Sequence, residues 1–231
     1  MAESAIPAIL KELDPHSVYI PAKQLKEVNE PLKGNFDGIG IQFSMQKDTV
    51  VVISTISGGP SEMVGIQPGD RIVEVDGEVV AGQDLSSNKI VDMLKGKRGT
   101  EVKVGVKRQN AGEMLHFNIT RDEIPLYSVD VSYMVNERTG YIKVSRFAKT
   151  TYKEFMKAVK ELHNKGAEKL VLDLRDNSGG YLKAATNIAD EFLPKDKLIV
   201  YTQGRNSPKQ EIYASSRGEG QDLDVAVLIN E

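Results

Sequence analysis

The sequence contains no cysteine, no tryptophan and only three histidines among its 231 residues. Without cysteine the chain can form no disulfide, no thiolate metal site and no cysteine nucleophile. The histidines, His16, His116 and His163, lie far apart along the chain, so they do not form a local metal-binding pattern. We therefore expect no metal site.

Long apolar runs and an excess of positive charge are missing as well. No apolar stretch approaches the ~20 residues that cross a bilayer, and the first residues lack the basic and apolar regions of a signal peptide. The 30 lysines and arginines are outnumbered by 33 aspartates and glutamates, whereas nucleic-acid binding depends on a basic surface. We therefore expect no nucleic-acid partner.

The composition that remains, 40% hydrophobic and 27% charged residues, is that of a globular chain long enough for one or two domains. Residues 36–122 predict one β-rich module with short helices. The β-branched run 49–56 and the alternating run 100–107 indicate strands. Asp76-Gly77 is typical of a hairpin turn, and residues 86–94 predict a helix.

A different pattern follows Pro125, where long strand and helix signals alternate. Strands are predicted over 169–174, 198–201 and 224–230, the first and last of them buried, and helices are predicted over 151–165 and 181–193. The order strand, loop, helix, strand over 169–201 is that of a βαβ unit, which predicts a parallel sheet with a right-handed crossover.

The segment Gly38-Ile39-Gly40-Ile41 opens the first strand of the module. Its two glycines let backbone amides turn toward one point, forming a nest that can bind a carboxylate. Gly-Gly-Pro-Ser, Gly-x-x-Pro-Gly-Asp-x-Ile and Val-Asp-Gly follow in order, beginning at Gly58, Gly65 and Val75. This order of motifs resembles a PDZ domain over about residues 36–122.

The resemblance implies that an extended peptide is bound as an added strand, with its C-terminal carboxylate in the amide nest. That role falls to Gly38, Ile39, Gly40 and Ile41. The helix 86–94 would form the other wall of the groove. Spacing alone leaves open whether its apolar side chains face the peptide or the core; these are Ile90, Val91 and Leu94.

The segment from Leu172 to Leu182, Leu-Asp-Leu-Arg-Asp-Asn-Ser-Gly-Gly-Tyr-Leu, resembles the Leu-Arg-x-Asn-Pro-Gly-Gly-x-Leu motif of carboxyl-terminal processing peptidases, the tail-specific proteases. Ser178 stands where proline is commoner. Leu13-Asp-Pro-His-Ser17 and the strand pattern from Gly140 to Phe147 are also similar to that family. The similarity therefore extends over nearly the whole chain.

This second resemblance implies a serine endopeptidase that cleaves with a Ser–Lys dyad, in which burial lowers the pKa of the lysine so that it acts as general base. The family's serine shortly follows a strand that corresponds to 225–231, so the chain is expected to stop before both dyad residues and to be inactive alone. Gly179 or Gly180 would donate a backbone N–H to the oxyanion, with Gly179 slightly favoured. No cofactor is implied, and the substrates are proteins or peptides recognised by their C-termini.

The implied architecture is an α/β protease core with a partly parallel sheet, interrupted by an inserted, mainly β PDZ domain. Its parts would be an N-terminal helical segment over 1–35, the PDZ domain over 36–122 and a partial α/β protease core over 123–231. The family resemblance also implies export to the periplasm or cell envelope.

Two other interpretations remain at this point. Ser178 lies in an Asn-Ser-Gly-Gly sequence like that around the nucleophile of trypsin-like proteases. However, the trypsin-like fold is two β-barrels, and no base that could activate Ser178 is evident. The chain could also be a non-catalytic PDZ adaptor whose hydrolase-like segment serves only as a scaffold.

Overall fold

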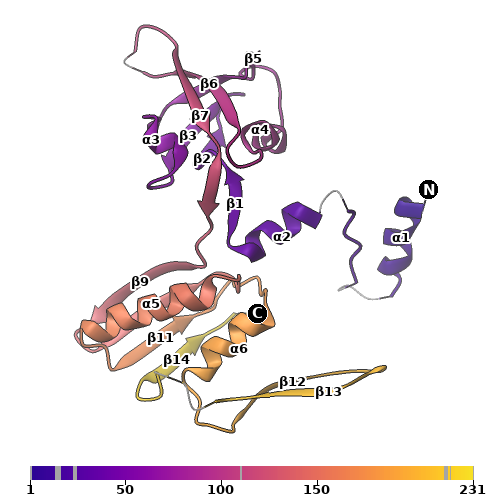
Figure 1. The fold of residues 1–231 in the computed structure, drawn as a ribbon, viewed down its shortest axis with the longest axis vertical. Coiled ribbons are helices and arrows are strands. Elements are labelled where there is room, and N and C mark those ends of the chain that lie inside the picture. Colours follow the sequence, from indigo (N-terminus) through magenta and orange to yellow (C-terminus); the bar gives the residue numbers. More distant parts are fainter. Residues whose placement is uncertain are drawn as a thin grey trace. The chain divides into compact units, whose positions relative to one another are not determined.

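The structure, a computed structural model, describes residues 2–13, 17–22, 25–109, 111–215, 218 and 220–230, leaving out the side chains of 2–4, 26 and 27. The predicted turn at Asp14, Pro15 and His16 lies outside the described residues. The chain forms two compact units, one of Asn35–Pro125 and one of Met1–Gly34 with Leu126–Glu231 (Figure 1). The first unit is thus an insertion in the second. No described helix is both long and apolar enough to cross a membrane.

The inserted unit is built on an antiparallel sheet with the order β2-β3-β4-β6-β7. These strands are β2 (Ile41–Met45), β3 (Val50–Thr55), β4 (Arg71–Val75), β6 (Glu101–Lys107) and β7 (Leu115–Thr120). The short β5 (Glu78–Val79) pairs with β4. The helices are α3 (Pro60–Met63) and α4 (Ser87–Leu94), and β1 (Asn35–Gly38) pairs with β8 (Asp122–Pro125) as a separate two-stranded sheet.

The core of this unit follows the predicted alternation. Val102, Val104 and Val106 are all buried on one face of β6, together with Ile90 from α4. The predicted hairpin turn has positive φ at both Asp76 and Gly77, as a type I′ turn requires. The strands over 49–56 and 100–107 and the helix over 86–94 are therefore confirmed.

The surrounding unit has a four-stranded sheet with the order β14-β11-β10-β9. Its strands are β9 (Val129–Asn136), β10 (Thr139–Val144), β11 (Lys169–Asp173) and β14 (Asp224–Leu228). β10, β11 and β14 are parallel, whereas β9 is antiparallel to β10. The helices are α5 (Thr151–Asn164) and α6 (Leu182–Asp190), with the N-terminal α1 (Ala2–Lys11) and α2 (Leu25–Lys33) in the same unit.

The helix α5 covers this sheet with a continuous apolar stripe. Phe155, Val159 and Leu162 are buried in one cluster with residues of β10 and β11. Leu162 lies so close to β10 that a Cβ on Gly140 would come within 2.8 Å of its Cδ1. The stripe predicted for this helix is confirmed, and the α/β class of the unit with it.

Two expectations about the last third of the chain are wrong. The segment 198–201 was expected to lie beside 169–174 in the parallel sheet, but β12 (Leu198–Gly204) pairs only with β13 (Ser207–Tyr213) in a separate hairpin. Local antiparallel pairing needs only a short turn, and it leaves the place beside β11 to β14. The parallel neighbours joined through a helix are instead β10 and β11 through α5, and β11 and β14 through α6 and the hairpin.

The strand β14 was expected to be buried, yet Val227 is 52% exposed and the following Ile229 is 74% exposed. Among the described strands, β14 lies at the edge of the sheet and pairs with β11 alone. An apolar, β-branched run is typical of strands in general, so the pattern did not distinguish an edge position from a central one.

Candidate functional site

The three parallel strands end at the same edge of the sheet, which is where α/β proteins usually hold their ligands. The loop after β11 is bonded to the segments that follow both neighbouring strands. Ser178 donates its amide to the carbonyl oxygen of Ser145 at 3.1 Å, and Leu174 donates its amide to that of Leu228 at 2.8 Å. The predicted glycine loop therefore lies where the ends of three strands meet.

Both glycines of the loop have a positive φ, +81° at Gly179 and +140° at Gly180. A parallel bridge links Gly180 to Phe147, whose amide donates to the carbonyl of Gly179 at 2.8 Å and whose carbonyl accepts from Tyr181 at 2.7 Å. A Cβ on Gly180 would lie 2.3 Å from the carbonyl oxygen of Phe147, whereas one on Gly179 would meet nothing within 4 Å. Close approach of the backbone thus requires glycine at position 180.

The two glycine amides differ in what they bind. The Gly179 amide donates to Oδ1 of Asn177 at 2.8 Å, and Nδ2 of Asn177 donates to the carbonyl of Val144, also at 2.8 Å. The Gly180 amide has no hydrogen-bond partner among the residues that the structure describes. Of the two oxyanion candidates, Gly180 therefore has the amide that is open to a ligand, whereas the sequence slightly favoured Gly179.

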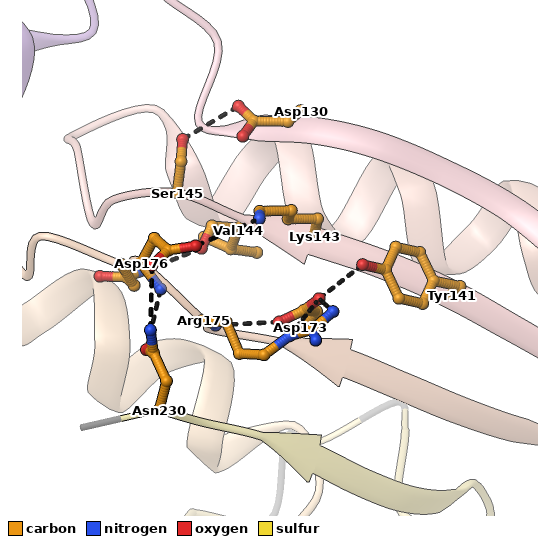
Figure 2. A network of polar contacts seen from close by, with 10 residues as sticks. Asp130, Tyr141, Lys143, Val144, Ser145, Asp173, Arg175, Asp176 and Asn230 are labelled. Atoms are coloured by element: carbon orange, nitrogen blue, oxygen red, sulfur yellow. Dashed lines mark hydrogen bonds and ion pairs between the residues drawn. The ribbon is translucent and has the colours of Figure 1, made fainter.

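The loop begins at a buried carboxylate, that of Asp173 at the end of β11 (Figure 2). Asp173 accepts from Nη2 of Arg175 at 2.7 Å, from the Arg175 amide at 2.9 Å and from the Tyr141 hydroxyl at 2.6 Å. The guanidinium of Arg175, and then the Tyr141 hydroxyl, lower the pKa of Asp173 well below its usual range. The same bonds raise the pKa of Arg175 and of Tyr141. The carboxylate stays ionised and fixes the first residues of the loop.

A second anchor joins the loop to the end of β14 (Figure 2). Asn230 accepts at Oδ1 from the Asp176 amide at 3.0 Å and donates from Nδ2 to Oδ1 of Asp176 at 2.9 Å. Sequence reasoning missed Asn230, Asp173 and Tyr141 as parts of the site. The one available signal was the carboxylate of Asp173 at the end of an otherwise apolar strand.

Among the described residues, Ser178 has no hydrogen-bonded base such as an activated serine needs. Its hydroxyl has no hydrogen-bond partner in the described part of the chain. His163 belongs to the last turn of α5, just before β11 begins, whereas Ser178 follows the opposite end of that strand. The described residues also hold no group of three or more histidine, aspartate or glutamate side chains that could bind a metal.

The inserted unit has its own pocket, of about 140 Å³, between the start of β2 and the end of α4. It is lined by Phe36, Gly38, Ile39, Gly40, Ile41, Phe43, Val91, Leu94 and Lys95. The candidate binding residues 38–41 are thus brought together with Val91 and Leu94. Ile90 does not line the pocket, because its side chain is fully buried in the core of the unit.

The turn before β2 has its carbonyls fixed and two of its amides open. Ser61 donates from its amide at 3.0 Å and from its hydroxyl at 2.7 Å to the carbonyl of Ile39, and Ile56 donates to that of Gly40 at 2.9 Å. The amides of Ile39 and Gly40 have no partner among the described residues. Since β2 is at the edge of its sheet, the turn leads directly into an unpaired strand edge.

The far wall of the pocket is held by a buried arginine that the sequence did not single out. Arg121 donates to the carbonyls of Met93 and Leu94 at 2.9 Å each, to that of Glu101 at 2.8 Å, and to Oγ1 of Thr100 at 3.1 Å. Two of these acceptors are orphan carbonyls at the end of α4, which side-chain donors commonly satisfy. Arg121 thus fixes the helix end that supplies Leu94 to the pocket.

The surrounding unit thus has an α/β fold with a glycine loop at its parallel strand ends, and the inserted unit has a pocket beside the free edge of β2. Residues 138–231 match the model of peptidase family S41, and residues 38–120 match that of the PDZ domain. The chain therefore combines a PDZ domain with a segment of peptidase family S41, as the carboxyl-terminal processing proteases do. The resemblance stated from the motifs is confirmed.

Two similar curated proteins are carboxy-terminal processing proteases. The chain is 35% identical over 218 residues to the carboxy-terminal processing protease CtpB of Bacillus subtilis (strain 168), covering 93% of this chain and 45% of the relative. It is 33% identical over 232 residues to CtpA of the same organism, covering 100% of this chain and 49% of the relative. The chain thus spans about half the length of the curated relatives it matches.

Among solved structures, the photosystem II D1 C-terminal processing protease is 25% identical with a TM-score of 0.47. The match covers 98% of this chain and 62% of that structure's chain.

Proposed function

We propose that this chain is part of a serine endopeptidase that recognises the C-termini of proteins through its PDZ domain and cleaves with a Ser–Lys dyad. The dyad residues would follow residue 231 in the complete protein, which leaves the described chain able to bind peptide but unable to cleave it. The observation that carries the proposal is the open amide of Gly180, in a loop that Asp176 bonds to Asn230 after β14.

In this proposal Gly180 supplies one donor of the oxyanion hole. The family's nucleophile is expected shortly after β14, whose end the Asp176–Asn230 bonds hold against the glycine loop. One such donor typically lowers the barrier by ~3 kcal/mol, provided that it is held rigidly. The bridge between Phe147 and Gly180 supplies that rigidity.

In the PDZ domain the amides of Ile39 and Gly40 would hold the peptide's terminal carboxylate, and the free edge of β2 would pair with its backbone. The terminal side chain would enter the pocket, which is lined mostly by apolar side chains such as Phe43 and Val91. A volume of about 140 Å³ favours a small or medium apolar residue at the C-terminus of the substrate. The resemblance further supports a protein exported to the periplasm or cell envelope.

The proposal is tested in two steps. The described chain should bind an apolar-ended peptide with a free C-terminus at least about tenfold more tightly than the same peptide amidated, because amidation removes charge-assisted bonds. The complete protein should cleave that peptide and react with a fluorophosphonate probe, and Ser178→Ala should still do both.

Each other outcome selects a different function. Binding without cleavage or labelling by the complete protein would favour the non-catalytic adaptor. Labelling that disappears in Ser178→Ala would favour the trypsin-like interpretation. Equal affinity for the free and amidated peptides would refute the carboxylate nest.

A further inference from the structure

We propose that Asp176 and Asn230 act as a clamp that positions the glycine loop for catalysis. This inference rests on the proposed function, because it assigns the pair a role in the same site. The two residues are 54 positions apart in sequence and are joined by two reciprocal hydrogen bonds, of 3.0 and 2.9 Å. Such a pair fixes both the distance and the orientation of the segments that carry it.

The backbone of Asp176 is held in an uncommon conformation. Its φ is +62°, a left-handed conformation that non-glycine residues seldom adopt and that costs roughly 1–3 kcal/mol. Aspartate tolerates this conformation better than most residues because its side chain bonds locally. Here the side chain bonds instead to Asn230, on the segment that follows the neighbouring strand.

The residues on both sides of Asp176 are also held by hydrogen bonds. Asp173 holds Arg175 on one side of position 176, and Asn177 binds the carbonyl of Val144 on the other. Among the side-chain hydrogen bonds of the described residues, only those of the Asp176–Asn230 pair connect the loop to the segment after β14. Together with the backbone bond between Leu174 and Leu228, the pair fixes the loop against the end of β14.

The location of the pair argues against a role in global stability. The side chain of Asp176 is 78% exposed, and polar pairs that are open to water add little to the free energy of folding. The charged group that faces the pair from β10 is Lys143, whose Nζ lies 4.0 Å from Oδ2 of Asp176. A displacement of about 1 Å at a catalytic site, by contrast, can cost about 100-fold in rate.

The pair can be tested by exchanging its two residues. Asp176→Asn preserves an acceptor for Nδ2 of Asn230, so it should leave the clamp intact. Asn230→Asp still accepts from the Asp176 amide, but it loses the side-chain bond and places two carboxylates face to face, which should open the clamp. The double variant Asp176→Asn/Asn230→Asp restores the side-chain bond with donor and acceptor exchanged, and it has the same net charge as the unmodified protein.

The expected result in the complete protein is a fall in kcat of about 10- to 100-fold for Asn230→Asp with KM little changed. The double variant should recover kcat to within a few-fold of the unmodified protein. The temperature of unfolding should be nearly the same in all four proteins. An unchanged kcat in Asn230→Asp, or a double variant no better than that single variant, would overturn the clamp.

A second measurement separates the clamp from the proposed function. The amide NMR signals of Gly180 and Leu174 in the described chain should shift in Asn230→Asp and return in the double variant. This readout needs no catalysis. If the complete protein proves inactive but these signals respond as expected, the proposed function fails and the clamp stands as a structural device of the loop. If the signals do not respond, the clamp itself is refuted.

Discussion

Replacing Gly180 by alanine tests the central feature of the site, the close approach of the glycine loop to Phe147. The new Cβ would lie 2.3 Å from the carbonyl oxygen of Phe147 and 2.8 Å from its carbonyl carbon. Both atoms belong to the backbone, so no change of side-chain rotamer can relieve the overlap. The loop must therefore move away, which breaks the bonds that join Phe147 to Gly179 and to Tyr181.

The cost follows from these two effects. Positive φ at a non-glycine residue costs roughly 1–2 kcal/mol, and each of the two lost backbone bonds roughly 0.5–1.5 kcal/mol. We expect Gly180→Ala to lower the free energy of unfolding by about 2–5 kcal/mol. Gly179→Ala is the matched control, because its Cβ meets nothing within 4 Å. It should lose only the strain, about 1–2 kcal/mol.

The assay is urea unfolding of the described chain followed by far-ultraviolet circular dichroism, since the sequence has no tryptophan. The inserted unit serves as an internal standard, because its transition should not move in either variant. In the complete protein, Gly180→Ala should also lose far more activity than Gly179→Ala. Equal losses of stability and activity in the two variants would show that the contact with Phe147 does not hold the loop.

Three further predictions concern the anchors and the pocket. Asp173→Asn should lower the free energy of unfolding near neutral pH. Because the pKa of Asp173 is lowered in the folded state, the difference in free energy of unfolding between variant and unmodified protein should shrink below about pH 4, as urea unfolding at several pH values would show. Arg121→Ala should destabilise the inserted unit by about 3 kcal/mol, since it leaves several carbonyls without a donor, and should weaken peptide binding in a titration. Val91→Glu should weaken binding of an apolar-ended peptide with little change in stability. Ile90→Ala should instead lower the free energy of unfolding by about 3 kcal/mol. The reverse pattern would mean that the assignment of Val91 to the pocket and Ile90 to the core is wrong.

The sequence predicted the inserted unit well because its signals are local. The turn at Asp76-Gly77 and the alternation of Val102, Val104 and Val106 each depend on residues within a few positions of one another. The placement of β12 was wrong for the opposite reason. Distant segments compete for the place beside β11, and an apolar run does not indicate which strand it will pair with.

The same distinction separates the parts of the site that could be predicted from those that could not. The glycine loop was found because its motif lies on one segment. The bonds of Asp173 to Tyr141 and of Asp176 to Asn230 depend on the register of β11 with β10 and with β14. In that register Asp173 lies opposite Leu228, so residues shortly after each strand face one another. No spacing within a single segment specifies this.

The two candidate sites, the turn before β2 and the glycine loop after β11, would both bind a ligand through backbone amides rather than side chains. Near Ile39 the neighbouring carbonyls are already bonded to Ser61 and Ile56, and beside Gly180 the carbonyl of Gly179 is bonded to the Phe147 amide. These bonds hold the open amides in place. Amides of this kind bind the negative charge of a carboxylate or an oxyanion. Every polypeptide substrate has a terminal carboxylate and peptide carbonyls, whatever its side chains are. A pair of such sites therefore suits the proposed enzyme, which must recognise the end of a chain and cleave its backbone while accepting different side chains along it.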